Sequence, residues 1–207
     1  MLSLDTLRRA FFFSIVFVAL LPPSDLSAQI KIHRSPPPPG AREHVVVPGE
    51  RYGAKGIRRW FLGSGYRDVW TTPIEVPVLD LDTKMGGLDV DGMGGYGQTY
   101  TLEFKGKDGL DYAVRSIDKD PTRRMDPLLK GTLVESIVQD QTSGFLPTAG
   151  LVVDPLLEAA GLLYPKHELA VVPDDPRLGE FRDSTAGLIG MFVDRPQEGE
   201  DGTPGFA

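Results

Sequence analysis

The sequence contains no cysteine and only three histidines in 207 residues. The absence of cysteine excludes disulfide bonds, cysteine-based zinc sites, a thiol nucleophile and the acylated cysteine of a lipoprotein. His33, His44 and His167 share no metal-ligand spacing, so the sequence does not predict a histidine metal site. No apolar run reaches the roughly 20 residues that a membrane-spanning helix needs.

Basic residues are outnumbered. The chain has 22 Lys and Arg against 29 Asp and Glu, a formal net charge of −7. Residues 1–28 carry two Arg and two Asp, so their removal would leave this charge unchanged. Nucleic-acid backbones bind basic surfaces, and an acidic domain therefore argues against nucleic acid as a partner. The length suits one domain of ordinary size.

The clearest pattern in the chain is at its start. Arg8 and Arg9 precede the apolar run AFFFSIVFVALL at residues 10–21, two prolines follow, and Ala28 supplies a small residue for cleavage. This order predicts a signal peptide over residues 1–28 and export, to the periplasm, the outer membrane or the medium. An uncleaved membrane anchor is the alternative, but the run is too short to span a bilayer. No transmembrane helix is expected after cleavage.

Two polar segments frame the predicted domain at residues 46–196. Residues 29–45 hold four consecutive prolines, which predicts an extended linker, with a ligand for a proline-recognising groove as the alternative. Residues 197–207 are acidic and predict a disordered tail. Between Val46 and Trp70, glycine and basic residues interleave with aromatics. This stretch predicts an aromatic cap on the core, with a polyanion-binding patch as the alternative.

Short apolar runs separated by turn residues predict an antiparallel sheet of about five strands with packed helices, an α+β fold. Two prolines place the first strand at an edge, and the Lys107-Asp108-Gly109 turn predicts a hairpin. A pair of helices, broken at Asp154-Pro155, is expected over residues 147–161. The predicted strands cover residues 71–82, 99–104, 112–117, 169–172 and 187–193.

The glycine-rich stretch before the second predicted strand contains Gly92, Gly94 and Gly97 in G-x-G-x-x-G spacing. A dinucleotide-binding fold would place a helix after this motif, but a strand follows here. Two interpretations remain open. The backbone N–H groups could cover phosphates, as the glycine loop of a kinase does, or the stretch could be a solvated hairpin tip. Nearby aspartates fail the calcium-loop template because Lys84 takes a ligand position.

Asp126-Pro127 is predicted to begin a helix, with Asp as the N-cap and Pro at the first position. At 100° per residue the aliphatic side chains share one face, Asp140 lies on its flank and Glu135 points away. If a helix carboxylate pairs with Arg115 or Lys119, we expect it to be Asp140. The alternative is that Asp140 has no partner.

Four stretches of the sequence are YRDVWTTPIEVPVLDL, YAVRSIDKDP, VQDQTSGFLPTAGLVVDPLLEAAG and VVPDDPRLGEFRD. They resemble the N-terminal region of a family of large, mostly uncharacterised exported bacterial proteins. The likeness covers roughly Tyr66 to Pro196. Members of that family are similar to atypical kinases, and some carry metallophosphoesterase or outer-membrane-barrel regions. The resemblance implies a fold like the kinase small lobe, with ATP and magnesium as the ligands to expect.

Carried over to this sequence, the resemblance implies that residues 86–97 cover the phosphates of a ligand. It also implies that Arg115 or Lys119 is the basic residue that faces the nucleotide. Arg115 stands where a kinase has its strand lysine, and an arginine is a different phosphate ligand, so standard kinase chemistry is not implied. The sequence also ends before the two aspartates that a kinase large lobe would supply. We therefore expect the N-terminal part of a longer protein, with a C-terminal large lobe as its partner.

Two functions remain open from the sequence. The first is a kinase-like fragment that contributes to nucleotide or phosphate binding but is not catalytic alone. The second is a periplasmic or envelope-associated protein-interaction module without enzymatic activity. A metal-dependent hydrolase has almost no residue support. The predicted ligand-binding residues are Gly92, Gly94, Gly97, Arg115, Lys119 and Asp140.

Overall fold

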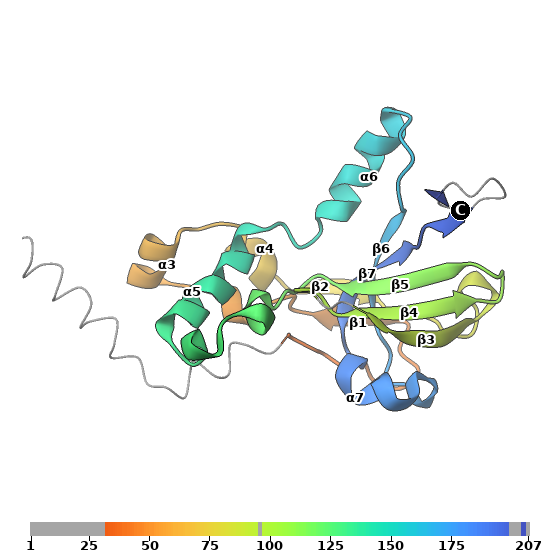
Figure 1. Cartoon of the computed structure of the whole chain (residues 1–207), viewed down its shortest axis with the longest axis horizontal. Helices are drawn as coiled ribbons and strands as arrows, with labels where there is room; N and C mark the ends of the chain where they lie inside the picture. The colour runs from red at the N-terminus through yellow and green to blue at the C-terminus, as the bar shows by residue number, and fades with distance from the viewer. Residues whose placement is uncertain (1–31, 95–96, 199–203, 206–207) are drawn as a thin grey trace, which may run out of the picture.

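The computed structural model describes residues 32–94, 97–198 and 204–205. The expected signal peptide lies outside this part of the chain. Within it, a five-stranded sheet occupies one end of the molecule and a group of short helices occupies the other (Figure 1). The α+β class predicted from the sequence is confirmed.

The main sheet is antiparallel throughout, with its strands in the order β3-β4-β5-β7-β6. The strands are β3 (Leu88–Gly94), β4 (Thr101–Gly106), β5 (Asp111–Ser116), β6 (His167–Val171) and β7 (Ile189–Asp194). The predicted sheet of about five strands is therefore confirmed. Four of the predicted strands correspond to β4, β5, β6 and β7 within a few residues.

Side chains alternate across the main sheet and pack into two cores, one on each face. On β5, for example, Val114 enters one core and Ala113 the other. The second core also receives Tyr52 and Trp70, whose ring centroids lie 4.8 Å apart. The aromatic cap predicted between Val46 and Trp70 is therefore formed by these two rings only, because Trp60, Phe61 and Tyr66 are exposed.

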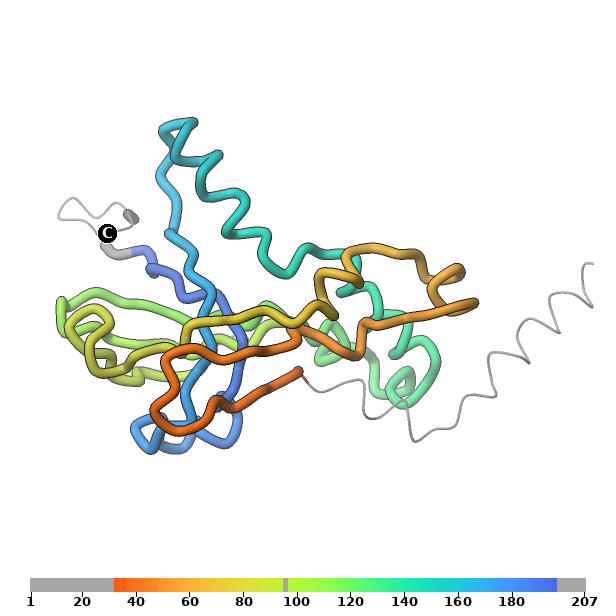
Figure 2. The backbone as a smooth tube through the Cα atoms, turned by 180° about the vertical axis from the view of Figure 1, so that it is seen from behind, coloured from red at the N-terminus to blue at the C-terminus, as the bar shows by residue number. Residues whose placement is uncertain are grey.

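The proline-rich stretch packs against the domain from Ile32 onward. Strand β1 (Glu43–Val46) begins inside the expected linker and pairs with β2 (Ile74–Pro77). Upstream, the Ser35 N–H donates to the Gly187 carbonyl over 2.8 Å. Figure 2 shows this segment, red to orange, running across the back of the sheet before it enters β1. The boundary expected at residue 46 does not separate it from the domain.

The first strand of the main sheet differs from the prediction. The run at residues 71–82 forms only β2, which pairs with β1 in a separate two-stranded sheet. The glycine-rich stretch instead forms β3, with a register shift between Val90 and Gly92. Such a bulge tolerates glycine, and the apolar residues before it alternate as a strand requires. The glycines conceal that alternation because they carry no side chain.

The α-helices are α3 (Gly56–Leu62), α4 (Arg67–Thr71), α5 (Leu133–Asp140), α6 (Ala149–Ala159) and α7 (Arg182–Thr185). The 3₁₀ turns are η1 (Glu50–Tyr52), η2 (Lys84–Gly86), η3 (Pro121–Arg124), η4 (Pro127–Leu129), η5 (Gln141–Gly144) and η6 (Pro176–Phe181). In the expected tail, β8 (Gln197–Glu198) pairs with β9 (Pro204–Gly205), and the rest of the tail lies outside the described residues.

Helix α5 begins later than predicted. Asp126 caps only the single turn η4, which ends at the extended Lys130, and Gly131 then adopts φ +73°. Thr132 accepts a hydrogen bond from a backbone N–H of the new helix, and Glu135 accepts one from the Gly131 N–H. This resembles a capping box, which the order Thr132-Leu-Val-Glu135 could have indicated.

The orientation of α5 is also opposite to the prediction. Its polar side chains Glu135, Gln139 and Asp140 are buried, whereas Val134 and Ile137 are exposed. Glu135 does not point away, because it closes the start of its own helix. The polar face of α5 therefore packs against the protein, whereas the aliphatic face is exposed at Val134 and Ile137 and half-buried at Leu133 and Val138.

Helix α6 is continuous where a broken pair of helices was predicted. Pro155 lies inside it, although an interior proline costs the helix one backbone hydrogen bond. The buried Asp154 accepts from the His167 N–H over 2.7 Å, which ties α6 to β6. Gly161, with φ +65°, follows the helix end as predicted. Figure 1 shows α6 projecting away from the sheet.

Candidate anion-binding cavity

A cavity of about 430 Å³ lies between the second core face of the sheet and the segment that leads into α6. Its volume is in the range of small-molecule sites. Arg115 and Lys119 line it together. Its apolar walls come from Trp70, Ile117, Phe145, Leu146, Met191 and Val193.

Arg115 reaches the cavity because of its place on β5. Alternation puts it on the same face as Ala113, between Thr101 of β4 and Met191 of β7 in the cross-strand register. Strand pairing on both sides fixes its backbone, while its side chain is exposed. Arg115 thus presents a cationic fork at the rim of an apolar cavity.

Lys119 approaches the same cavity from the loop after β5. Its ammonium nitrogen lies 4.6 Å from the centroid of the Phe145 ring, a cation–π contact. Among the described residues, neither Lys119 nor Arg115 forms an ion pair with a carboxylate. Both cations therefore remain available to an anionic ligand.

Asp140 has different partners from those predicted. Its carboxylate accepts two hydrogen bonds from the Arg67 guanidinium, at 3.0 and 2.5 Å, and lies 3.5 Å from Arg58. The side chains of Arg67 and Asp140 are 1% and 5% exposed. The predicted pairing of Asp140 with Arg115 or Lys119 is wrong, and Asp140 does not line the cavity.

A second buried cluster, centred on Asp118, holds the backbone of the cavity residue Lys119 in place. Asp118 accepts from the Tyr52 hydroxyl and from Arg51, both at 2.6 Å, and from the Lys119 N–H at 2.8 Å. Gln139 donates to the Lys119 carbonyl over 2.7 Å. Burial and the neighbouring carboxylate of Asp118 raise the pKa of Tyr52. The cluster fixes the backbone at Lys119.

Sequence reasoning missed this cluster and the Arg67–Asp140 pair. Both join residues more than sixty positions apart, so no local spacing reveals them. The composition of one stretch did indicate that buried ion pairs could form. Several arginines between Val46 and Trp70 lie in a stretch rich in core-forming aromatics, and buried arginines require carboxylate partners.

The glycines lie at the same end of the sheet as Arg115 but not in the cavity wall. Gly94 pairs with Thr101, which pairs in turn with Arg115, so the three residues form one cross-strand row. The turn after β3 contacts the Lys119 loop, because the Asp120 N–H donates to the Gln98 carbonyl over 2.7 Å. A side chain at position 92 or 97 would meet no atom within 4 Å of its Cβ.

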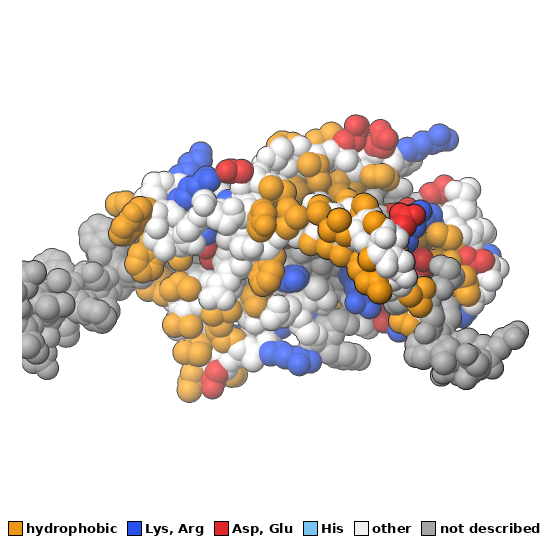
Figure 3. Space-filling model, turned by 90° about the horizontal axis from the view of Figure 1, so that it is seen from above, with side chains coloured by type: hydrophobic (Ala, Val, Ile, Leu, Met, Phe, Trp, Pro, Cys, Tyr) orange, Lys and Arg blue, Asp and Glu red, His pale blue; other side chains and the backbone are white. Residues whose placement is uncertain are grey.

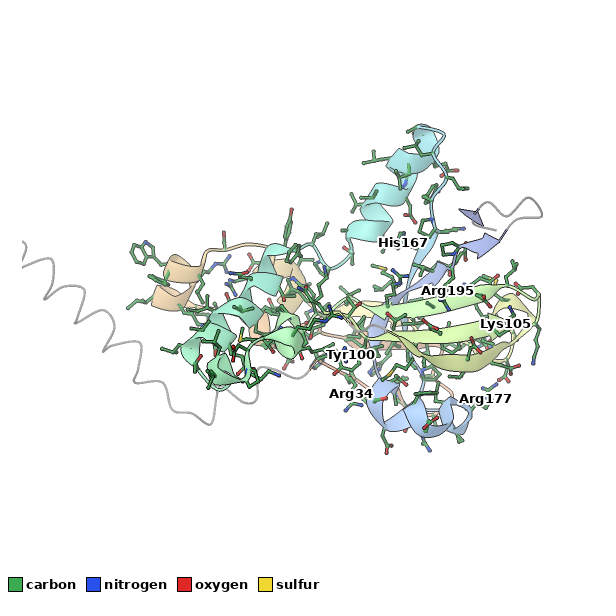
Figure 4. The ribbon with its side chains drawn as sticks, viewed as in Figure 1. Arg34, Tyr100, Lys105, His167, Arg177 and Arg195 are labelled. Atoms are coloured by element: carbon green, nitrogen blue, oxygen red, sulfur yellow. The ribbon has the colours of Figure 1, made fainter. Side chains whose placement is uncertain are left out.

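The far end of the cavity is formed by α6 and β6. The His167 ring lies 2.7 Å from the Asp154 carboxylate, and Figure 4 shows His167 at the base of α6, above the sheet. Asp194 also lines the cavity, and burial, followed by the charge of Glu168, raises its pKa.

The arrangement of the cavity supports binding of an anion, because two cations on an apolar cavity can hold an anionic group. Of the potential catalytic groups on the described wall, Ser116 is hydrogen-bonded to Tyr100 and Asp118, and His167 to Asp154. Among the described residues, no group of three or more His, Asp or Glu side chains could hold a metal ion. No helix in the described ranges is long and apolar enough to cross a membrane.

No protein-family model, curated protein or solved structure matches this chain. The family resemblance therefore stays an expectation from the sequence.

Proposed function

We propose that this protein is a binding module for a phosphate-bearing ligand, such as a nucleotide, and that it does not catalyse a reaction alone. The observation that carries the proposal is the cavity in which Arg115 and Lys119 face the same space. Charge-assisted hydrogen bonds from Arg and Lys are the usual means of holding phosphate. The apolar wall beside them suits the flat body of a nucleobase or a similar group.

The order of the elements supports a kinase-like origin for this module. Arg115 lies on the third strand of the sheet, and α5 follows it, as a helix follows the lysine-bearing strand of a kinase. In an active kinase that lysine pairs with a glutamate of the helix. Here the carboxylates of α5 are engaged elsewhere, Asp140 with Arg67 and Glu135 with the start of the helix. This departure supports binding without phosphoryl transfer.

The proposal includes export, on the strength of the signal-peptide pattern at residues 1–28. ATP with magnesium is the first ligand to test, because the family resemblance implies it. Inorganic phosphate then tests the anion contact without the apolar body.

The test is a thermal-shift titration of the purified chain with ATP and magnesium, and separately with inorganic phosphate. A ligand at a hundred times its Kd stabilises the folded state by about 2.7 kcal/mol, so the melting temperature should rise. In the Arg115→Ala/Lys119→Ala variant we expect affinity to fall at least about 100-fold, because each charge-assisted hydrogen bond contributes about 1.5–3 kcal/mol.

The matched control is Lys105→Ala/Lys107→Ala. It removes the same charge from the exposed hairpin at the other end of β4, away from the cavity. A control that loses binding as much as the cavity variant would contradict the proposal, and so would the absence of any shift in the parent protein.

A second function, a protein-interaction module of the envelope, is favoured by the outward face of α6. Val152, Val153 and Leu156 are exposed on it, and soluble monomers rarely leave such faces bare. A photo-crosslinking residue at position 156 tests this in cells. A single envelope protein captured at position 156 but not at Lys107, combined with no ligand shift in the titration, would replace the first function by the second.

A further inference from the structure

Helix α3 presents an apolar stripe to solvent. Ile57, Trp60 and Phe61 follow i, i+3, i+4 spacing and so share one face of the helix. Their exposed fractions are 82%, 83% and 73%. An ordinary surface helix turns such a face toward the core, so α3 has the opposite orientation.

Ion pairs hold α3 in this orientation. Arg59 forms two hydrogen bonds with Asp68 of α4, both at 3.0 Å, and Arg58 lies 3.5 Å from the buried Asp140 of α5. The arginine side of the helix therefore faces the protein. The contacts of Arg58 and Arg59 with the protein therefore leave the apolar stripe facing solvent.

The surface around α3 is basic although the whole chain is acidic. Residues 50–71 and 118–145 together carry nine basic and seven acidic residues. Four of these acids are buried, at positions 118, 120, 135 and 140, and Arg51 and Arg67, which pair with two of them, are almost fully buried as well. Seven bases and three acids therefore remain at the outer surface. The exposed basic residues of the two segments are Lys55, Arg123, Arg124 and Lys130.

These features lie at one end of the molecule. Figures 1 and 2 both place α3 and the start of α5 at the end opposite the hairpin of β4 and β5. The exposed Val134 and Ile137 of α5 add to the apolar surface there. Figure 3 shows apolar side chains gathered over this end, with Lys and Arg side chains beside them.

We propose that this end of the molecule binds the surface of an anionic phospholipid bilayer. Exposed Trp and Phe beside Lys and Arg are the composition of helices that lie in the headgroup region, where aromatic rings are favoured. The basic side chains match the negative potential of the lipid phosphates. The apolar stripe of α3, Lys55 and Lys130 do not line the cavity, so the inference stands apart from the proposed function.

The chain has only two tryptophans, and this permits a direct test. Trp70 is fully buried, so the difference in emission between the parent chain and Trp60→Phe reports on Trp60 alone. With vesicles of equal parts phosphatidylglycerol and phosphatidylcholine, we expect this signal to shift to shorter wavelength and to be quenched by brominated lipid. With phosphatidylcholine alone, binding should be at least about tenfold weaker because the basic side chains lose their partners.

Two variants separate the apolar and the charged contributions. Ile57→Asp/Phe61→Asp should bind at least about tenfold more weakly, and Lys55→Gln/Lys130→Gln should bind more weakly and lose salt dependence. All four side chains are exposed, so both variants should keep the urea midpoint of the parent.

Three results would overturn the inference. Trp60 could stay in water while the chain sediments with the vesicles, which would assign membrane binding to another segment. Binding could be equal on both vesicle types. The Trp60 shift could also appear without vesicles and grow with protein concentration, which would make a second copy of this chain the occupant of the surface.

Discussion

Single residues connect the helical end of this protein to its sheet through buried charge. Arg67 and Asp140 are removed from water and satisfy each other with two hydrogen bonds, while Asp118 joins Arg51, Tyr52 and the Lys119 backbone. Taking such charges out of water costs several kcal/mol per ion, and good geometry only offsets that cost. These pairs therefore determine the packing of the helices against each other and add little to the free energy of unfolding.

The Arg67–Asp140 pair can be tested by removing one partner. Asp140→Ala leaves the Arg67 charge buried without its carboxylate, so we expect the free energy of unfolding to fall by about 3–5 kcal/mol in urea denaturation. The double variant Arg67→Met/Asp140→Leu removes both charges and should recover most of the loss. A single variant within 1 kcal/mol of the parent would show that the pair is not closed in solution.

At the scale of elements, the sequence predicts strands better than helices in this protein. Strands β4 to β7 follow from apolar alternation and turn residues, which are local signals. Helix α5 was predicted from its apolar stripe, but its polar face is buried because Arg67 and the Lys119 loop supply partners for it. Periodicity locates such a helix and cannot decide which face turns inward when buried charges compete with the core.

The attachment of α6 to β6 gives a prediction at this scale. A Cβ at Gly150 would lie 2.7 Å from the His167 ring, so α6 can approach β6 only because residue 150 has no side chain. We expect Gly150→Ala to displace α6, to increase amide hydrogen exchange over residues 149–159 and to lower stability by about 1–3 kcal/mol.

Gly144→Ala is the control for this change, because nothing lies within 4 Å of its Cβ and its φ is not positive. Equal exchange in the two variants would show that contact with His167 does not limit the position of α6.

At the scale of the whole molecule, the cavity was only partly predictable. Arg115 and Lys119 are close in sequence and flank the end of one strand, so a shared site could be expected. Asp140 could not be assigned, because Arg67 lies 73 positions away and no spacing rule connects them. Gly94 lies in the same cross-strand row as Arg115, but β3 holds Gly92 and Gly94 in a strand and not in a loop.

The segment before β1 links the stability of the whole molecule to the cavity. The His33 N–H donates to Asp118 over 3.1 Å, and Asp118 in turn accepts from the Lys119 N–H. A chain that begins at Val47 loses that bond, all of β1 and the buried Val46. Burial of a valine contributes about 1.5–3 kcal/mol and each hydrogen bond about 0.5–1.5 kcal/mol, so we expect a loss of at least about 3 kcal/mol in urea denaturation.

The matched comparison is a chain that begins at Ile32, which retains these contacts and should keep the stability of the parent. If the segment also positions Lys119, the chain from Val47 should bind phosphate more weakly than the chain from Ile32 at temperatures where both are folded. Equal stability of the two chains would mean that the stretch before residue 47 behaves as the free linker its prolines suggest. If the chain from Val47 is less stable but binds phosphate equally well, the stretch before residue 47 contributes to the fold only. The contact between His33 and Asp118 would then have no effect on ligand binding.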